Sequence, residues 1–175
     1  MDGEEIEKWQ DNVSHELGSI GEKVAKRWLE RCGYEVHTWD SVRSKIKDYT
    51  SLPSRLRRIR KSETYEIARQ HFNRVESFLN KLYGNKLESM VRAEDEMAQL
   101  EKIIRVHSSS LRVGFDFIAK KDSEVFLVEV KANESELTRY QKEILDLGKK
   151  NGFKGIIVRP KIRIEISSRV ECQFL

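Results

Sequence analysis

The sequence has very little cysteine and no long hydrophobic segment. Its two cysteines, Cys32 and Cys172, lie 140 positions apart, so they form neither a metal-type pair nor a disulfide framework. No uninterrupted apolar run approaches the ~20 residues that span a bilayer. The N-terminus is acidic where a secretory signal begins basic and then turns apolar. We therefore expect a cytoplasmic protein with no membrane segment and no structural zinc site.

The net charge of +4 is the sum over a chain that contains one strongly acidic and one strongly basic segment. Residues 1–22 carry seven acids against one base, or −6, and residues 41–61 carry eight bases against one acid, or +7. A basic segment of this kind is a candidate footprint for a polyanion such as nucleic acid, although a solvated basic loop would have the same composition. The eight bases are Arg43, Lys45, Lys47, Arg55, Arg57, Arg58, Arg60 and Lys61.

Both ends of the chain show the periodicities of regular structure. Apolar residues at three- and four-residue steps predict a helix over 13–31, and alternation predicts a strand over 34–39. In the last third, alternation predicts strands over 112–119, 124–132, 153–158 and 162–166, with a helix over 137–150. This order indicates an α/β protein with a mixed sheet flanked by helices.

The middle of the chain, residues 40–111, has a different pattern. Leu52-Pro53-Ser54 is a turn signal within the basic segment. Two amphipathic helices are predicted over 62–83 and 86–106, with Ser62 a candidate N-cap and Gly84-Asn85 between the helices. We expect a helical hairpin that packs on itself, on the body of the protein or on a second subunit.

Three residues of the last third carry the chemistry. Asp116 lies in one predicted strand, and Glu129 and Lys131 lie in the next, on the same face because side chains alternate along a strand. Two carboxylates at adjacent strand ends suit Mg²⁺, which prefers hard oxygen ligands and acidifies a bound water for phosphodiester hydrolysis. An edge hairpin with a plain Glu–Lys pair would show the same three residues, so they leave both interpretations open.

Four motifs in order carry a family resemblance. They are Gly18 to Val36 (GSIGEKVAKRWLERCGYEV), Gly114-Phe-Asp116, Val128-Glu-Val-Lys-Ala132 and Leu137-Thr-Arg-Tyr-Gln141. Together they resemble the PD-(D/E)xK nuclease superfamily, with spacing similar to that of small archaeal Holliday-junction resolvases, over about residues 14–39 and 112–159. The resemblance implies a restriction-endonuclease-like core, with a long helical insertion between its first and second strands.

The resemblance also implies roles for individual residues. Asp116 and Glu129 would bind Mg²⁺ or Mn²⁺, Glu22 would complete the metal shell, Lys131 would be the catalytic lysine, and Gln141 would lie near the metal or the phosphate. For Glu22 and Gln141, an exposed helix position explains the residue about as well. Phe115 stands where the family motif has proline, a position that often varies.

These implications define the expected organisation and function. Residues 1–39 and 112–175 would form one discontinuous nuclease core, and residues 40–111 the basic insertion that grips nucleic acid or pairs subunits. The expected activity is that of a metal-dependent endonuclease acting on DNA, with junction or branched DNA among the open substrates, and the expected assembly is a homodimer. The alternative is a non-catalytic module of the same fold that binds nucleic acid or protein.

Overall fold

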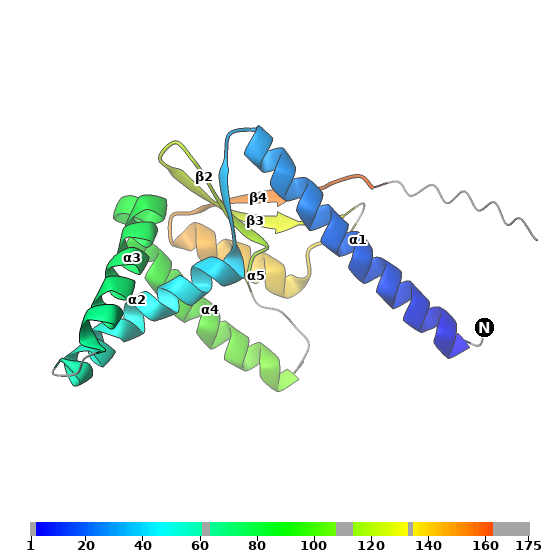
Figure 1. Cartoon of the computed structure of the whole chain (residues 1–175). Coiled ribbons are helices and arrows are strands. Elements are labelled where there is room, and N and C mark those ends of the chain that lie inside the picture. The colour runs from blue at the N-terminus through cyan, green and yellow to red at the C-terminus, as the bar shows by residue number, and fades with distance from the viewer. Residues whose placement is uncertain (1–2, 61–63, 108–113, 133–134, 163–175) are drawn as a thin grey trace, which may run out of the picture.

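The computed structural model describes residues 3–60, 64–107, 114–132 and 135–162. Its helices are α1 (Gly3–Arg31), α2 (Trp39–Ile59), α3 (Tyr65–Tyr83), α4 (Leu87–His107) and α5 (Arg139–Lys150), with a short 3-10 helix, η1 (Gly84–Lys86). Its strands are β1 (Glu35–Thr38), β2 (Phe117–Lys121), β3 (Glu124–Val130) and β4 (Lys154–Val158). The expectation of a mixed α/β architecture is confirmed (Figure 1).

The strands form one sheet in the order β1-β2-β3-β4. β2 pairs antiparallel with β1 and with β3, whereas β4 pairs parallel with β3. The register places Thr38, Phe117, Val128 and Ile156 side by side across the sheet. The C-terminal ends of β1, β3 and β4 therefore meet the start of β2 at one end of the sheet.

Helices cover both faces of this sheet. On one face α1 buries Leu29 against a cluster that includes Val36, Phe117 and Val128. The other face is covered by α5 and by the helices of 40–111, in one larger cluster that runs from Val42 on α2 to Leu127 on β3. The proposed boundaries at 39 and 112 stay a prediction, but the segments on either side of them share this core.

Residues 39–59 form one helix, so the turn predicted at Leu52-Pro53-Ser54 is wrong. Pro53 lies inside α2, where proline costs about 3 kcal/mol because it lacks a backbone donor and clashes with the preceding turn. Burial of an apolar stripe on this helix offsets that cost. The buried residues of the stripe are Trp39, Val42, Ile46 and Leu52.

The two helices expected in the middle of the chain are present. Gly84, at φ 55°, ends α3, and η1 leads into α4. Ser62, the candidate N-cap, lies outside the described residues, and the residue that precedes α3 is Thr64. α3 packs most extensively against α2, with the rings of Tyr49 and Phe72 stacked at 5.8 Å. The two expected helices, α3 and α4, therefore pack together with a third helix, α2, rather than on each other alone.

The last third agrees with expectation within a few residues at each boundary. The strand predicted over 112–119 begins only at Phe117, and the strand predicted over 162–166 lies almost wholly outside the described residues. Within the described part of the chain, no helix combines the length and apolar character needed to cross a bilayer.

Candidate active site

The candidate site lies at the end of the sheet where β3 finishes and β2 begins. The chain enters β2 through Gly114, whose φ of 146° is one that side chains rarely adopt. A Cβ atom at this position would lie 2.2 Å from Nε1 of Trp39, so only glycine fits beneath the indole ring. Trp39 also donates its backbone N–H to the carbonyl of Asp116, at 3.2 Å. The start of α2 thus holds the segment that carries the first candidate acid.

Asp116 is bound to the neighbouring strand through both backbone and side chain. Its backbone N–H donates to Val128 at 3.0 Å, and its Oδ2 accepts the backbone N–H of Val130 at 2.6 Å. These bonds lie on either side of Glu129, so the two carboxylates lie at the same level, Asp116 just before β2 and Glu129 near the end of β3. The convergence predicted for Asp116 and Glu129 is therefore present.

Glu129 is an unusual residue for the interior because it is an acid with only 4% of its surface exposed. Burial is the largest influence on its carboxyl group, and the charge of Asp116 acts in the same direction. Together they raise the pKa of Glu129 to about 7, against the lowering effects of Lys131 and Gln141. Perturbed carboxyl groups of this kind are enriched at functional sites.

Lys131 and Gln141 both contact the Glu129 carboxylate. Nζ of Lys131 lies 3.3 Å from Oε1 of Glu129, and Nε2 of Gln141 donates to the same oxygen. Since Lys131 lies two residues after Glu129 on one strand, the alternation seen in the sequence brings these two side chains together. The structure therefore unites four of the predicted site residues.

The placement of Gln141 follows from the way α5 begins. Thr138 caps this helix, accepting the backbone N–H of Gln141 at 3.3 Å and donating its own N–H to Oε1 of Gln141 at 2.9 Å. The capping box leaves the Gln141 amide nitrogen available for Glu129. At the other end of α5, a Cβ on Gly148 would lie 2.1 Å from Cδ1 of Leu127, so this glycine lets the helix lie close against β3.

Glu22 lies on α1, which covers the face of the sheet opposite α5. A Cβ on the preceding residue, Gly21, would lie 3.3 Å from Cβ of Ala132, which places this turn of α1 beside the end of β3. Glu22 is half-buried there. Within the described ranges, however, no three His, Cys, Asp or Glu side chains gather closely enough to hold one metal ion. The two carboxylates of Asp116 and Glu129 are therefore the pair that the fold brings together.

This pair fits a divalent cation. A buried carboxyl group with a raised pKa is costly to ionise, and a bound cation would remove that cost by favouring the charged form. Oxygen ligands on adjacent strands match the donor preference of Mg²⁺ and Mn²⁺.

Most residues of the basic segment lie along α2. Lys47, Arg55, Arg57 and Arg58 are exposed, and within the described chain none of them lies within ion-pairing distance of a carboxylate. Arg60, just after the helix, is exposed too, whereas Lys61 lies outside the described residues. Arg55 and Arg58 line a hollow of about 460 Å³, whose other lining residues are Ser51, Ser54 and Ile59. Cations and hydroxyls on one side of a helix suit phosphate groups.

Arg43 has a different role from the rest of the basic segment. Its guanidinium binds Oε1 of Glu94 and Oε2 of Glu101, each at 2.6 Å, across the contact between α2 and α4. Glu94 is itself buried, and burial raises the pKa of its carboxyl group while Arg43 opposes that rise. Arg43 therefore neutralises an internal charge, and the prediction that it belongs to the exposed basic surface is wrong.

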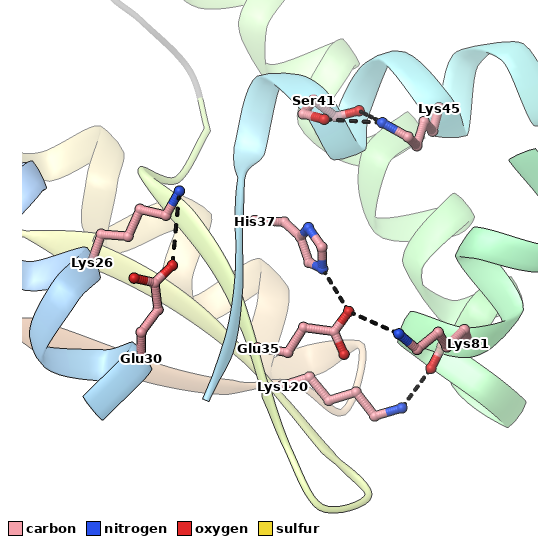
Figure 2. A network of polar contacts seen from close by, with 8 residues as sticks. All are labelled: Lys26, Glu30, Glu35, His37, Ser41, Lys45, Lys81 and Lys120. Atoms are coloured by element: carbon pink, nitrogen blue, oxygen red, sulfur yellow. Dashed lines mark hydrogen bonds and ion pairs between the residues drawn. The ribbon is translucent and has the colours of Figure 1, made fainter. Parts of the chain in front are cut away.

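Lys45 belongs to a polar network near β1 (Figure 2). It donates to Oγ of Ser41 at 3.0 Å and lies 4.8 Å from the centroid of the Phe78 ring. Nearby, Glu35 accepts from His37 at 3.0 Å and pairs with Lys81 at 3.5 Å; its hydrogen bond with His37 contributes most to lowering its pKa. The Glu35–Lys81 pair links β1 to α3, and the Lys45–Phe78 contact links α2 to α3. Half-buried Lys45 therefore contributes less to the basic surface than Lys47 does.

Two supporting residues were not identified from the sequence. The sequence pattern places Trp39 only at the end of a predicted strand, and Glu94 only within a predicted helix. An acid near the apolar stripe of the second predicted helix was a signal for Glu94, but its partner Arg43 lies 51 positions away. No protein-family model, no curated protein and no solved structure matches this chain.

Proposed function

We propose that this protein is a metal-dependent endonuclease that hydrolyses phosphodiester bonds in DNA, built on a restriction-endonuclease-like core. The observation that carries the proposal is the meeting of Asp116 and Lys131 with a buried Glu129 at one end of the sheet. A surface Glu–Lys pair needs neither a second acid nor burial, and burying an acid without a functional partner costs stability.

In this proposal Asp116 and Glu129 would hold Mg²⁺ or Mn²⁺, and Glu22 would be the further acid of the site. The ion, when bound, would supply an acidified water and neutralise charge that builds on the phosphate. Gln141 holds the Glu129 carboxylate in place through its amide. Its position in the capping box fixes that amide before substrate arrives.

Lys131 contacts the reacting groups in one of two ways. As a base it takes the proton of the attacking water; as a cation it stabilises the phosphate oxygens. In both cases a bond forms between the water oxygen and phosphorus while the bond to the leaving oxygen breaks. Replacing Lys131 with arginine separates these roles, because arginine keeps the charge and does not lose its proton.

The exposed basic residues of α2 provide a track for the DNA backbone. α2 begins at the site, through the contact between Trp39 and Asp116, and leads away from the sheet (Figure 1). Arg58 is nineteen residues farther along, or about 28 Å at 1.5 Å per residue. That length is comparable to about eight base pairs at 3.4 Å each. Phosphate contacts along it would position duplex or branched DNA without reading its sequence.

The test is a cleavage assay on labelled duplex, single-stranded, flap and four-way-junction DNA, with Mg²⁺, Mn²⁺ or EDTA. Wild type should cut in either metal and not in EDTA. Asp116→Asn and Lys131→Ala should each lower the rate at least about 100-fold, the scale on which single catalytic groups act. Asp146→Asn and Lys142→Ala are matched controls, because both residues are exposed on α5 and should leave the rate unchanged.

A protein that binds DNA without cutting it would contradict the nuclease proposal. If no DNA is cut while wild type and both site variants bind DNA equally well, the alternative of a non-catalytic binding module is correct. Calorimetric titration with Mn²⁺ supplies an independent readout. The nuclease proposal requires binding heat that Asp116→Asn weakens, and the binding module requires none.

A further inference from the structure

The longest helix of the described residues, α1, carries an exposed apolar surface. Ile20, Val24 and Trp28 of α1 are 42%, 46% and 54% exposed. A groove of about 360 Å³ runs between α1 and β4, and Val24, Trp28 and Ile156 are among the residues that line it. Three of the six exposed large hydrophobic residues of the described chain lie together on this side of α1. Clustering of this kind marks an interaction surface.

The apolar positions continue along the whole of α1. Apolar residues stand at positions 6, 9, 13, 17, 20, 24 and 28, at steps of three and four. This spacing repeats after eleven residues, which keeps one stripe on one side of a nearly straight helix. The sheet contact uses a neighbouring stripe, through Gly21, Ala25 and Leu29. The N-terminal turns of α1 run out beyond the sheet (Figure 1).

The distribution of charge along α1 indicates which molecule covers this apolar stripe. Residues 3–17 of α1 carry five acids against one base, or −4, and residues 18–31 carry four bases against two acids, or +2. Two copies of α1 lying antiparallel would place each acidic half beside the basic half of its partner. The stripe is centred on position 17, so a two-fold axis at Leu17 brings position 6 opposite 28, 13 opposite about 20, and 5 opposite 29, beside Arg27 on the same edge of the stripe. A two-fold interface requires this kind of self-complementarity.

We propose that the protein forms a homodimer through antiparallel packing of α1 against α1 of a second copy. A helix of 29 residues is about 44 Å long, enough for an extended contact. The aromatic and branched residues of the stripe form its centre, with Lys23 and Arg27 at its rim. Both cations are exposed, and neither forms an ion pair with another described residue. The dimer contact therefore lies on α1 and β4 rather than on the helices of 40–111.

The oligomeric state of the full chain tests this surface independently of any nuclease activity. Sedimentation equilibrium at micromolar protein should give the mass of two chains for wild type. Val24→Glu should raise the dissociation constant at least about 100-fold, because it buries a charge at the centre of the contact. Ile67→Glu is the matched control, since Ile67 is an exposed isoleucine on α3 and its replacement should leave the dimer intact. Circular dichroism confirms that each variant is folded.

Charge reversal tests the antiparallel arrangement without placing a charge in the stripe. Arg27→Glu should weaken the dimer about tenfold, and adding Glu5→Arg in the same chain should restore it, because positions 5 and 27 are two eleven-residue repeats apart and lie on the same edge of the stripe. In a parallel dimer these positions face their own copies, so the double variant would give no rescue. Cross-linking supplies a second readout. With Cys32 and Cys172 replaced by serine, Val13→Cys chains should form disulfides with Ile20→Cys chains rather than with each other.

Three results would overturn the proposal. One is a wild type that remains a single chain at 100 µM. Another is a Val24→Glu protein that is still dimeric. The third is a monomeric wild type that dimerises once residues 163–175 are removed, because the C-terminal segment of the same chain would then be the occupant of the groove.

Discussion

The buried carboxyl group of Glu129 makes stability depend on pH in a direction that can be measured. Its pKa in the folded protein is about 7, against an ordinary value of 4.5. Between these values the folded protein holds a proton that the unfolded chain has lost, so stability falls as pH rises through this window. A difference of about 2.5 units, at about 1.4 kcal/mol each, corresponds to about 3 kcal/mol.

The perturbation is Glu129→Gln, which keeps the shape of the side chain and removes its titration. Urea unfolding of both proteins in EDTA, at pH 4.5 and pH 8.0, gives four free energies of unfolding. Wild type should lose up to about 3 kcal/mol more than the variant between these pH values. Other titrating groups contribute to both proteins and cancel in the difference. Parallel losses in wild type and Glu129→Gln would refute the reasoning.

Two further measurements identify the cause of the raised pKa. Asp116→Asn removes a neighbouring negative charge, so it should reduce the additional free energy of unfolding that is lost between pH 4.5 and pH 8.0. If that loss is unchanged, burial is the only cause of the raised pKa. Adding Mn²⁺ at pH 8.0 should stabilise wild type, by about 2.7 kcal/mol at one hundred times the dissociation constant, and should not stabilise Glu129→Gln. A metal effect of equal size in both proteins would place the ion elsewhere.

Three other predictions follow from specific contacts. Arg43→Met should destabilise the protein by about 3–5 kcal/mol in urea unfolding, because it leaves the buried Glu94 unpaired, and Glu94→Met in the same chain should recover most of that loss. Gly148→Val should lower stability and cleavage together, since a side chain there drives α5 off Leu127 and moves Gln141; Gly152→Val, at a position with open space around it but at φ 82°, should affect stability alone. Arg55→Ala and Arg58→Ala should each reduce the slope of log affinity against log salt by about one in a DNA-binding titration, whereas Arg74→Ala, an exposed arginine on α3, should leave that slope unchanged.

The sequence was sufficient to predict the elements with strong periodicity. Alternation predicted β2 and β3, and three- and four-residue spacing predicted α1, α3, α4 and α5, because these patterns reflect burial on one side of each element. The same alternation placed Glu129 and Lys131 on one face of a strand, where the structure finds them paired. Their convergence with Asp116 was also predictable, because a tight hairpin connects their strands.

The sequence was misleading where tertiary packing outweighs local preference. Pro53 and its neighbours favour a turn, yet the buried stripe from Trp39 to Leu52 keeps α2 helical through the proline. Arg43 looked like part of a basic surface, and only the approach of α4 turned it inward to Glu94 and Glu101. Neither outcome is visible locally, because the deciding partners are distant in sequence.

The sequence by itself thus determined which charged residues share a face and which faces are apolar, since both follow from residue type and spacing along one element. The tertiary structure decided which other residues each of these side chains contacts and how far each is buried. It buried Glu129 beneath Gln141, which changes the acidity of that carboxyl group, and it left Trp28 exposed, because α1 uses its other side to cover the sheet. Burial and pairing depend on contacts between distant segments, and only the folded chain brings those segments together.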